Sequence, residues 1–294
     1  MTTDWKQLSV AEIEQRYDQG VYAANAREVN QWYTQQSKNV LAALHGERFA
    51  YGLSASDYGY WFKAGTPGRP VVVFIHGGAW RIGTAEDYLF PARWLTQQLD
   101  VNYVCLNFDN APATGGRIFP MLDQLMQGVS WVSRNMAKYQ AASEVHLVSH
   151  SSGSHLAASL AGLDWATLLP HAPGLMKSVL LCSGIYDLEP VGYSKRREYL
   201  ELSATEVFAL SPLRHSVNRS LRFVVLRGEL ESPEFIRQHD AYVTKLQREG
   251  VALQEGVGFG LNHFEILQTF GDAGGYMAQA LRRLVEGSSN AKKG

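Results

Sequence analysis

The sequence predicts an α/β domain built on a mostly parallel sheet, and two observations support this fold class. Several short runs of the 294-residue chain are continuously apolar, too continuous for strands that expose one face to water. Segments with helical spacing alternate with these runs, as in parallel sheets joined by helical crossovers. The helices should therefore cover both faces of the sheet, and the loops at the carboxyl ends of the strands should carry the ligand site.

The apolar runs and one amphipathic segment define the elements of this domain. Buried strands are expected at 71–75, 103–108, 145–149, 178–183 and 222–228, with a last strand at 252–257. In the segment 119–139, five apolar residues fall on one helical stripe: Leu122, Leu125, Met126, Val129 and Val132.

We expect a single domain over 1–286. Its first part, about 1–48, is polar and helical in pattern, and 50–62 has the composition of a hairpin. A loop-rich insertion at about 187–221 could cap the site as a lid. The residues 287–294 form a polar tail.

Charge and composition exclude several classes of protein. The chain has 27 basic and 28 acidic residues, so it offers no broad electrostatic footprint for nucleic acid or an anionic membrane. Its start lacks a signal-peptide pattern, and no run approaches the roughly 20 apolar residues that span a bilayer. We therefore expect a cytoplasmic protein. Cys105 and Cys182, far apart in the chain, are expected to be reduced core thiols rather than a disulfide or a metal site.

A serine-rich turn follows the strand expected at 145–149. It includes Ser149, Ser151 and Gly153 and is close to the G-x-S-x-G pattern, in which a sharp strand-to-helix turn exposes a nucleophilic serine. Ser149 stands where the first glycine is usual, and a serine is small enough to fit there. The turn predicts Ser151 as a nucleophile, although a serine-rich turn that only caps a helix has a similar composition.

A glycine pair follows the strand expected at 71–75. Because glycines have no side chains, the backbone N–H groups of this loop can approach a carbonyl oxygen of a substrate. The N–H groups of Gly77, Gly78 or Ala79, together with that of Ser152, are expected to form an oxyanion hole. Taken alone, the segment could also be a plain glycine turn.

A serine hydroxyl is a weak nucleophile without a base, so a histidine oriented by a carboxylate is expected. Of the nine histidines, His263 is the best placed, since it follows the last expected strand in a glycine-bounded loop. The same position would also suit a hydrogen-bonded structural histidine.

The carboxylate should follow the strand expected at 222–228, and Glu231 is the choice. Ser232 and Pro233 are typical of a helix N-cap and first helical residue, so Glu231 would lie beside a helix N-terminus that favours a charged carboxylate. Glu229 stays open as the alternative acid. If Glu231 is the acid, Glu229 and Glu234 are surface or capping carboxylates.

These segments together resemble the arylformamidase (kynurenine formamidase) branch of the α/β-hydrolases, within the wider HGG-type esterases. The resemblance covers most of the chain, and its least generic parts are SGIYDLEP at 183–190 and SPEFIRQ at 232–238. It implies an α/β-hydrolase fold with Ser151 as nucleophile, Glu231 as acid and His263 as base. It also implies a homodimer.

The sequence departs from that family's usual pattern at several places. The family usually has Asp at the position of Glu231, Gly at that of Ser149 and Asp at that of Asn262. The segment 108–116 lacks the tyrosine-bearing pattern usual after its strand. Glutamate is one methylene longer than aspartate but can still orient an imidazole, so these departures bear on the substrate more than on the reaction class.

The expected reaction is acyl transfer from a formamide or ester to Ser151, without a metal or an organic cofactor. The partner is then a small aromatic or heteroaromatic molecule rather than a nucleic acid or a membrane. A carboxylesterase acting on short-chain esters is the alternative function. A hydrolase fold kept only as a binding protein is the second alternative, although all three positions hold competent residue types.

Aromatic residues near the expected loops are candidates for the substrate pocket. Trp80, Tyr186 and Phe259 are the principal ones, with Tyr88 and Phe264 beside them. Large aromatic residues at strand ends are also routine components of a core, so both interpretations stay open for each of them.

Overall fold

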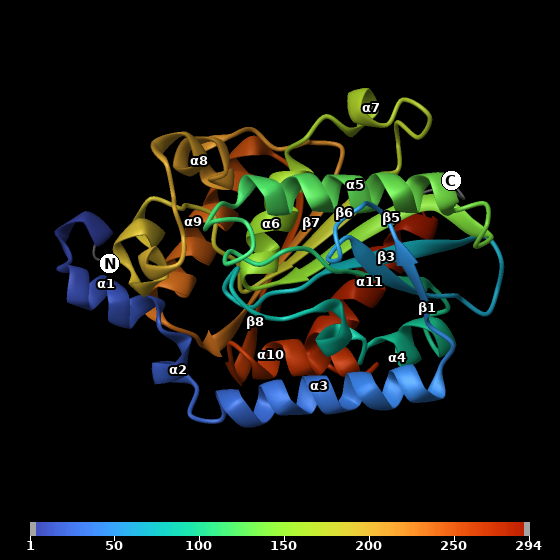
Figure 1. Cartoon of the computed structure of the whole chain (residues 1–294), viewed down its shortest axis with the longest axis horizontal. Helices are drawn as coiled ribbons and strands as arrows, with labels where there is room; N and C mark the ends of the chain where they lie inside the picture. The colour runs from blue at the N-terminus through green and yellow to red at the C-terminus, as the bar shows by residue number, and fades with distance from the viewer. Residues whose placement is uncertain (1–3, 291–294) are drawn as a thin grey trace.

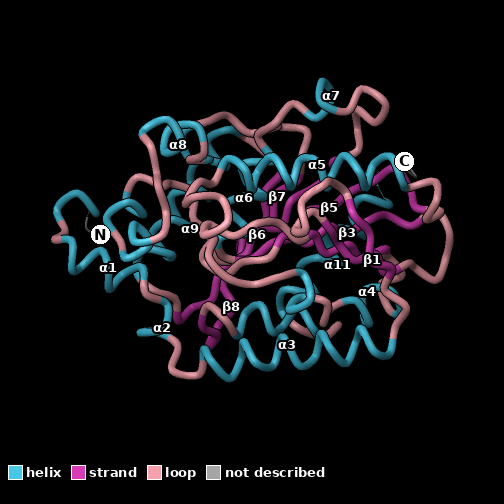
Figure 2. The backbone as a smooth tube through the Cα atoms, viewed as in Figure 1, coloured by secondary structure: helices cyan, strands magenta, loops and turns pink. Residues whose placement is uncertain are grey.

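An eight-stranded sheet forms the centre of the computed structural model, which describes residues 4–290 (Figures 1 and 2). The strand order is β1-β2-β4-β3-β5-β6-β7-β8. The pairs β1/β2 and β2/β4 are antiparallel, and the other pairs are parallel. The strands are β1 (Glu47–Ala50), β2 (Tyr58–Phe62), β3 (Arg69–Ile75), β4 (Asn102–Leu106), β5 (Ala141–His150), β6 (Met176–Cys182), β7 (Arg222–Leu230) and β8 (Ala252–Asn262). The predicted fold class is confirmed.

Helices cover both faces of the sheet, as buried parallel strands require (Figure 1). Side chains of α5, α6 and α9 pack on one face, and those of α3, α4, α10 and α11 pack on the other. The helices are α1 (Val10–Tyr17), α2 (Gln19–Tyr22), α3 (Ala26–Ala43), α4 (Ala92–Gln97), α5 (Phe119–Asn135), α6 (Ser152–Ala161), α7 (Trp165–Leu168), α8 (Ala204–Ala209), α9 (Pro233–Glu249), α10 (Glu265–Gln268) and α11 (Tyr276–Asn290).

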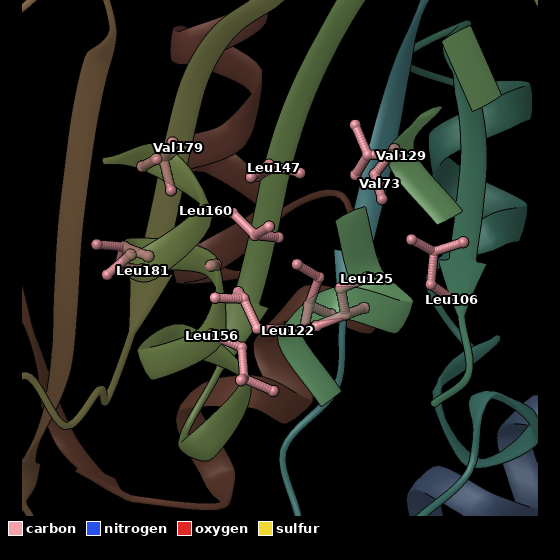
Figure 3. Packing of buried hydrophobic residues seen from close by; sticks show 14 of the residues in the cluster. Val73, Leu106, Leu122, Leu125, Val129, Leu147, Leu156, Leu160, Val179 and Leu181 are labelled. Atoms are coloured by element: carbon pink, nitrogen blue, oxygen red, sulfur yellow. The ribbon is translucent and has the colours of Figure 1, made fainter. Parts of the chain in front are cut away.

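The strand β3 shows why the runs are continuously apolar. Val71, Val73 and Ile75 face the layer of α5 and α6, whereas Val72 and Phe74 face the opposite layer. Figure 3 shows the first of these layers, where leucines of the two helices lie against strand side chains. Burying each large aliphatic side chain contributes about 1.5–3 kcal/mol. Both sets of alternating positions are therefore held in the core.

The last strand is longer than the sequence predicts. The stretch 258–262, expected as a loop, is the end of β8, where Gly258 pairs with Gly228 and Asn262 with Leu230 of β7. Pairing to β7 continues past Gly258 with a shift in register between Gly228 and Leu230, where Gly260 has a φ of 70°. Residue 263 consequently follows the strand directly.

The C-terminal helix also continues further than predicted. α11 ends at Asn290, so the first four residues of the predicted tail, 287–290, are helical, and 291–294 lie outside the described residues. Leu284 and Val285 are buried, which anchors the last turns of this helix to the sheet.

The segment 187–221 and the N-terminal helix α1 meet at one end of the sheet. The segment 187–221 forms α8 and the short 3-10 helices η3 (Pro190–Tyr193), η4 (Lys195–Glu198) and η5 (Pro212–Arg214). α1 packs against η3 and α9 (Figure 1).

None of the helices within residues 4–290 has the length and apolar character that a membrane crossing requires.

Gly153 in α6 lies so close to the end of β3 that it should not tolerate a side chain. A Cβ there would be 2.3 Å from the carbonyl oxygen of Ile75 and 2.4 Å from that of His76. We expect Gly153→Ala to lower the free energy of unfolding by about 1–3 kcal/mol, as overpacking does. Urea unfolding measures this change. Gly192→Ala is the control, because the space around Gly192 is empty, and it should change stability by less than about 0.5 kcal/mol. Equal stability of the two variants would contradict the close approach.

Candidate active site

The residues that follow the parallel strands lie in a row along one edge of the sheet. β3, β5, β6, β7 and β8 are successive neighbours, so their carboxyl ends adjoin one another. The row contains Gly77 after β3, Ser151 after β5, Ser183 after β6, Glu231 after β7 and His263 after β8. Residues far apart in the chain therefore meet at this edge.

Ser151 occupies a sharp turn between β5 and α6. Its φ of 56° and ψ of −127° are unusual for a residue with a Cβ, and such a conformation costs about 1–3 kcal/mol. Two backbone hydrogen bonds maintain it: the N–H of Ser151 donates to Cys182 at 2.9 Å, and its carbonyl accepts from Ser154 at 2.9 Å. The strained turn presents the serine hydroxyl at the edge of the sheet.

Two hydrogen bonds join Ser151, His263 and Glu231. Nε2 of His263 is 2.9 Å from Oγ of Ser151, and Nδ1 of His263 is 2.9 Å from Oε2 of Glu231. With Nδ1–H donating to the carboxylate, Nε2 is free to accept the proton of the serine hydroxyl. The structure thus brings together the three residues that the sequence singled out.

Glu231 is a buried carboxylate with several hydrogen-bond donors. Burial alone raises its pKa, but the facing His263 and the hydrogen bonds from His263, Ser183 and the N–H of Gly228 outweigh this, so its pKa is below the ordinary value. Nε2 of Gln19 donates to it as well, at 3.1 Å. Glu231 therefore remains negatively charged at neutral pH.

The other two glutamates of this loop do not contact His263. Glu229 is exposed and accepts a hydrogen bond from the N–H of Gly260 at 2.8 Å. The prediction of Glu234 as a surface or capping carboxylate is wrong. Its side chain is fully buried and pairs with Arg237 at 2.8 Å, because the first turn of α9 packs inward.

The glycine loop after β3 approaches Ser151 closely. A Cβ on Gly77 would be 3.0 Å from Cβ of Ser151, so only glycine fits without displacement. Gly78 has a φ of 112°, and a Cβ there would be 1.8 Å from the carbonyl oxygen of Ile82. The N–H of Trp80 donates to Oγ of Ser152 at 3.1 Å, which ties this loop to the start of α6.

Backbone donors remain available where the two loops meet. Within residues 4–290, the N–H groups of Gly78 and Ala79 have no hydrogen-bond acceptor. Ser152 is the first residue of α6, and the N–H of a first helical residue has no acceptor within its own helix. Such N–H groups can stabilise a negative oxygen.

Three other histidines support this arrangement from the interior. Nδ1 of His76 donates to the carbonyl of Gly77 at 2.8 Å, and Nε2 of His150 donates to the carbonyl of His263 at 2.8 Å. Nε2 of His155 donates to the carbonyl of Leu210. Burial lowers the pKa of His150 to about 3 and that of His76 and His155 to about 4. All three are neutral at physiological pH and bond to backbone carbonyls, whereas Nε2 of His263 lies at hydrogen-bond distance from the serine hydroxyl.

A cavity of about 630 Å³ opens beside Ser151 and His263. This volume is within the range of sites for small organic ligands. Its aromatic wall consists of Tyr17, Tyr33, Tyr88, Tyr199 and Phe264, contributed by the N-terminal helices, the loop after β3, the segment after η4 and the turn after β8. The structure thus places Tyr88 and Phe264 at the pocket.

The three principal candidates for the pocket lie elsewhere. Trp80 is buried, and its indole N–H donates to Nδ1 of His155 at 3.3 Å. Tyr186 is also buried and stacks on Tyr242, whereas Phe259 is 82% exposed on the edge strand β8. The prediction that Trp80, Tyr186 and Phe259 line the pocket is therefore corrected. The backbone at these positions directs the rings of Trp80 and Tyr186 into the core and the ring of Phe259 into solvent.

Comparisons with known proteins show similarity to hydrolases in sequence and in fold. The BD-FAE family model matches residues 60–171, which include both the glycine loop and Ser151. Kynurenine formamidase of Danio rerio is 26% identical over 297 residues, which cover 96% of this chain and 99% of that protein. The Salmo salar protein of the same name is 29% identical over 74% of this chain and 73% of its own. Among solved structures, esterase LipW from Mycobacterium marinum matches with a TM-score of 0.70 at 16% identity, covering 99% of this chain and 98% of that one.

The chain has the α/β-hydrolase fold and is similar to kynurenine formamidases over most of its length. It is thus an enzyme that hydrolyses amides or esters. The described residues of this hydrolase contain no group of three or more His, Cys, Asp or Glu side chains arranged to hold a metal ion.

The structure accommodates two departures from the family's usual residues. The hydroxyl of Ser149 is fully buried and bonds to Oγ of Ser154 and to the carbonyl of Leu180, both at 3.1 Å. Oδ1 of Asn262 accepts from the N–H groups of Phe264 and Glu265 at 2.9 and 3.0 Å. In this hydrolase both side chains have their polar groups satisfied.

Sequence reasoning missed two neighbours of the carboxylate, Gln19 and Ser183. The amide of Gln19 bridges the acid loop, because it donates to Glu231 and accepts from the N–H of Ser232 at 3.2 Å. The hydroxyl of Ser183 donates to the other carboxylate oxygen. Ser183 begins the distinctive segment SGIYDLEP, whereas nothing local marks Gln19.

Removing the amide of Gln19 should destabilise the hydrolase. Gln19→Leu leaves the buried N–H of Ser232 without its acceptor and takes one donor from Glu231, which should cost about 1–3 kcal/mol. Urea unfolding of the whole chain measures the loss, and Gln15→Leu, at an exposed position of α1, is the matched control. If the two variants unfold at the same urea concentration, the bridge contributes nothing.

The lowered pKa of Glu231 predicts how stability depends on pH. The stabilisation by this carboxylate is complete above the unfolded carboxyl value of about 4.3 and is lost as pH falls through the lower folded value. Glu231→Gln should therefore be less stable than the wild type at pH 7, and the difference should shrink as pH falls below about 4. Glu229→Gln, at an exposed position, should follow the wild type throughout. A difference that is constant from pH 7 to pH 3 would show that the carboxyl is not ionised in the fold.

Proposed function

We propose that this hydrolase cleaves the formamide bond of a small N-formyl aromatic amine, with Ser151 as nucleophile. The hydrogen-bonded chain from Ser151 through His263 to Glu231, at the floor of the cavity, is the observation that carries the proposal. Three relatives that match 74% or more of the chain are named kynurenine formamidases, which supports a formamide as the substrate.

In the first step, His263 removes the proton of the Ser151 hydroxyl as the oxygen attacks the formyl carbon. The negative charge of Glu231 stabilises the imidazolium that forms and holds its Nδ1–H in place. The carbonyl oxygen becomes negative, and N–H groups of the glycine loop and of Ser152 stabilise it. The candidates in that loop are those of Gly77, Gly78 and Ala79, and those of Gly78 and Ala79 have no acceptor among the residues that the structure describes.

In the second step, His263 returns the proton to the leaving amine, so the C–N bond breaks and a formyl ester of Ser151 remains. Water then attacks this ester with the same imidazole as base, which releases formate and restores the serine. The aromatic amine is accommodated by the rings of the cavity wall, such as Tyr33, Tyr88 and Phe264.

Loss of the serine hydroxyl should abolish turnover and leave the fold intact. We expect Ser151→Ala to reduce kcat on an N-formyl arylamine by at least about 10⁴-fold, with a much smaller effect on binding. A fluorophosphonate probe should label the wild type but not this variant. Ser159→Ala is the control and should keep activity and labelling, because the Ser159 hydroxyl donates to the carbonyl of His155 within its own helix. Near-normal turnover by Ser151→Ala would exclude the serine mechanism.

The nature of the bond is tested by comparing matched substrates. The ratio of kcat/KM for an N-formyl arylamine to that for a short-chain ester of the corresponding phenol should favour the formamide, after correction for the uncatalysed rates. A strong preference for the ester would replace the formamidase assignment with a carboxylesterase. Absence of both hydrolysis and probe labelling would favour a binding protein.

A further inference from the structure

Ser183, which directly follows β6, has a backbone conformation that favours glycine. Its φ is 56°, in the left-handed region where a residue with a Cβ is strained. The glycine of this turn stands one position later, because a Cβ on Gly184 would collide with the phenol oxygen of Tyr186. Ser183 is only 1% exposed, so its hydroxyl does not serve to contact water. A side chain is thus kept at a buried position where its absence would relieve strain.

The hydroxyl of Ser183 donates to one oxygen of the buried carboxylate of Glu231. That oxygen, Oε1, also accepts from the N–H of Gly228 at 3.0 Å. The other oxygen, Oε2, lies 2.9 Å from Nδ1 of His263 and accepts from Nε2 of Gln19 at 3.1 Å. Each oxygen therefore has two donors, which fixes the plane of the carboxylate as well as its position.

The backbone around Ser183 is itself held by the sheet. The N–H of Ser183 donates to the carbonyl of Leu226 in β7 at 2.8 Å, so the turn is bonded to the neighbouring strand. The carbonyl of the preceding residue, Cys182, accepts from the N–H of Ser151 at 2.9 Å. The end of β6 therefore holds the nucleophile turn through its backbone and the acid through the Ser183 hydroxyl.

A long acidic side chain such as that of Glu231 needs several contacts to stay in one orientation. It has three rotatable bonds, and fixing them costs conformational entropy. The carboxylate can orient the imidazole of His263 while Oε2 stays in line with the Nδ1–H group. Without the Ser183 hydroxyl, Oε1 would keep one donor, the N–H of Gly228, and the carboxylate could turn about its last bond.

We propose that Ser183 is a positioning residue, whose hydroxyl holds the carboxylate of Glu231 in line with the imidazole of His263. The proposal rests on the function proposed above, because it gives Ser183 a part in the same reaction. Among the residues that the structure describes, Ser183 is not one of those that border the cavity, so it acts on the acid and not on the substrate. The fold tolerates the strained backbone at this position because a glycine could not make the contact.

Two substitutions separate the strain at Ser183 from its hydroxyl. Ser183→Gly removes both, whereas Ser183→Ala removes the hydroxyl and keeps the strain, so the glycine variant should unfold at the higher urea concentration. Both variants should nevertheless lose about 10- to 100-fold in kcat on an N-formyl arylamine, the loss that corresponds to one hydrogen bond to a charged group. KM should stay within about twofold of the wild-type value, because the substrate does not touch this residue.

Ser178→Ala is the matched control. Ser178 is a buried serine near the start of the same strand, away from its carboxyl end, and its hydroxyl lies 2.7 Å from Nδ1 of His146. This variant should be less stable than the wild type and keep kcat within about threefold. It shows whether a lost buried hydrogen bond in β6 is by itself enough to slow the reaction.

The proton between His263 and Glu231 gives a second measurement that needs no substrate. A proton held between an imidazole and a carboxylate resonates far downfield in the proton NMR spectrum. The wild type and Ser178→Ala should show this signal at the same position, whereas it should shift or broaden in both Ser183 variants.

Two results would overturn the assignment of Ser183. If kcat in Ser183→Gly is close to that of the wild type, or rises above that of Ser183→Ala in step with stability, the hydroxyl has a structural role alone. An unchanged NMR signal in Ser183→Gly, the less strained variant, leads to the same conclusion. Failure of the proposed function is distinct, because a wild type that does not hydrolyse the N-formyl arylamine still has the NMR signal with which to test Ser183.

Discussion

The strained backbone at Ser151 is the constraint on which the rest of the site depends. A positive φ at a residue with a side chain is unfavourable, so the surrounding structure must hold it. It does so with a hydrogen bond to Cys182 of the neighbouring strand and with two close approaches of glycine, Gly153 against the end of β3 and Gly77 against Ser151 itself. The turn then presents the serine hydroxyl at the sheet edge, and the backbone N–H and carbonyl of Ser151 are both hydrogen-bonded.

A second constraint is the buried charge of Glu231. A carboxylate removed from water is stable only if donors surround it, and here they come from four parts of the chain. Two belong to the sheet edge, at Ser183 and Gly228, one is His263, and the fourth is Gln19 of the N-terminal helices. The N-terminal segment is thus joined to the same hydrogen-bond network as the imidazole.

The wall of the cavity is built from segments outside the parallel sheet. α1, α2 and η4 contribute Tyr17, Gln19 and Arg196, whereas the sheet edge contributes Ser151 and His263. The sheet and the added helices therefore have different roles in the site. The sheet fixes the reacting groups with backbone hydrogen bonds, and the added helices shape the space and the charge that a substrate meets.

The amino-acid sequence by itself determined the sheet, its covering helices and the residue types at the reacting positions. These features are local. Continuous apolar runs specify buried strands, and the small residues around Gly77 and Ser151 specify tight turns because larger side chains would clash there. Tertiary structure decided which aromatic rings face the cavity, and Tyr33 and Tyr88 do so while Trp80 and Tyr186 are in the core. It also decided that Gln19 reaches Glu231, because contacts between segments more than 200 residues apart depend on packing that no local pattern encodes.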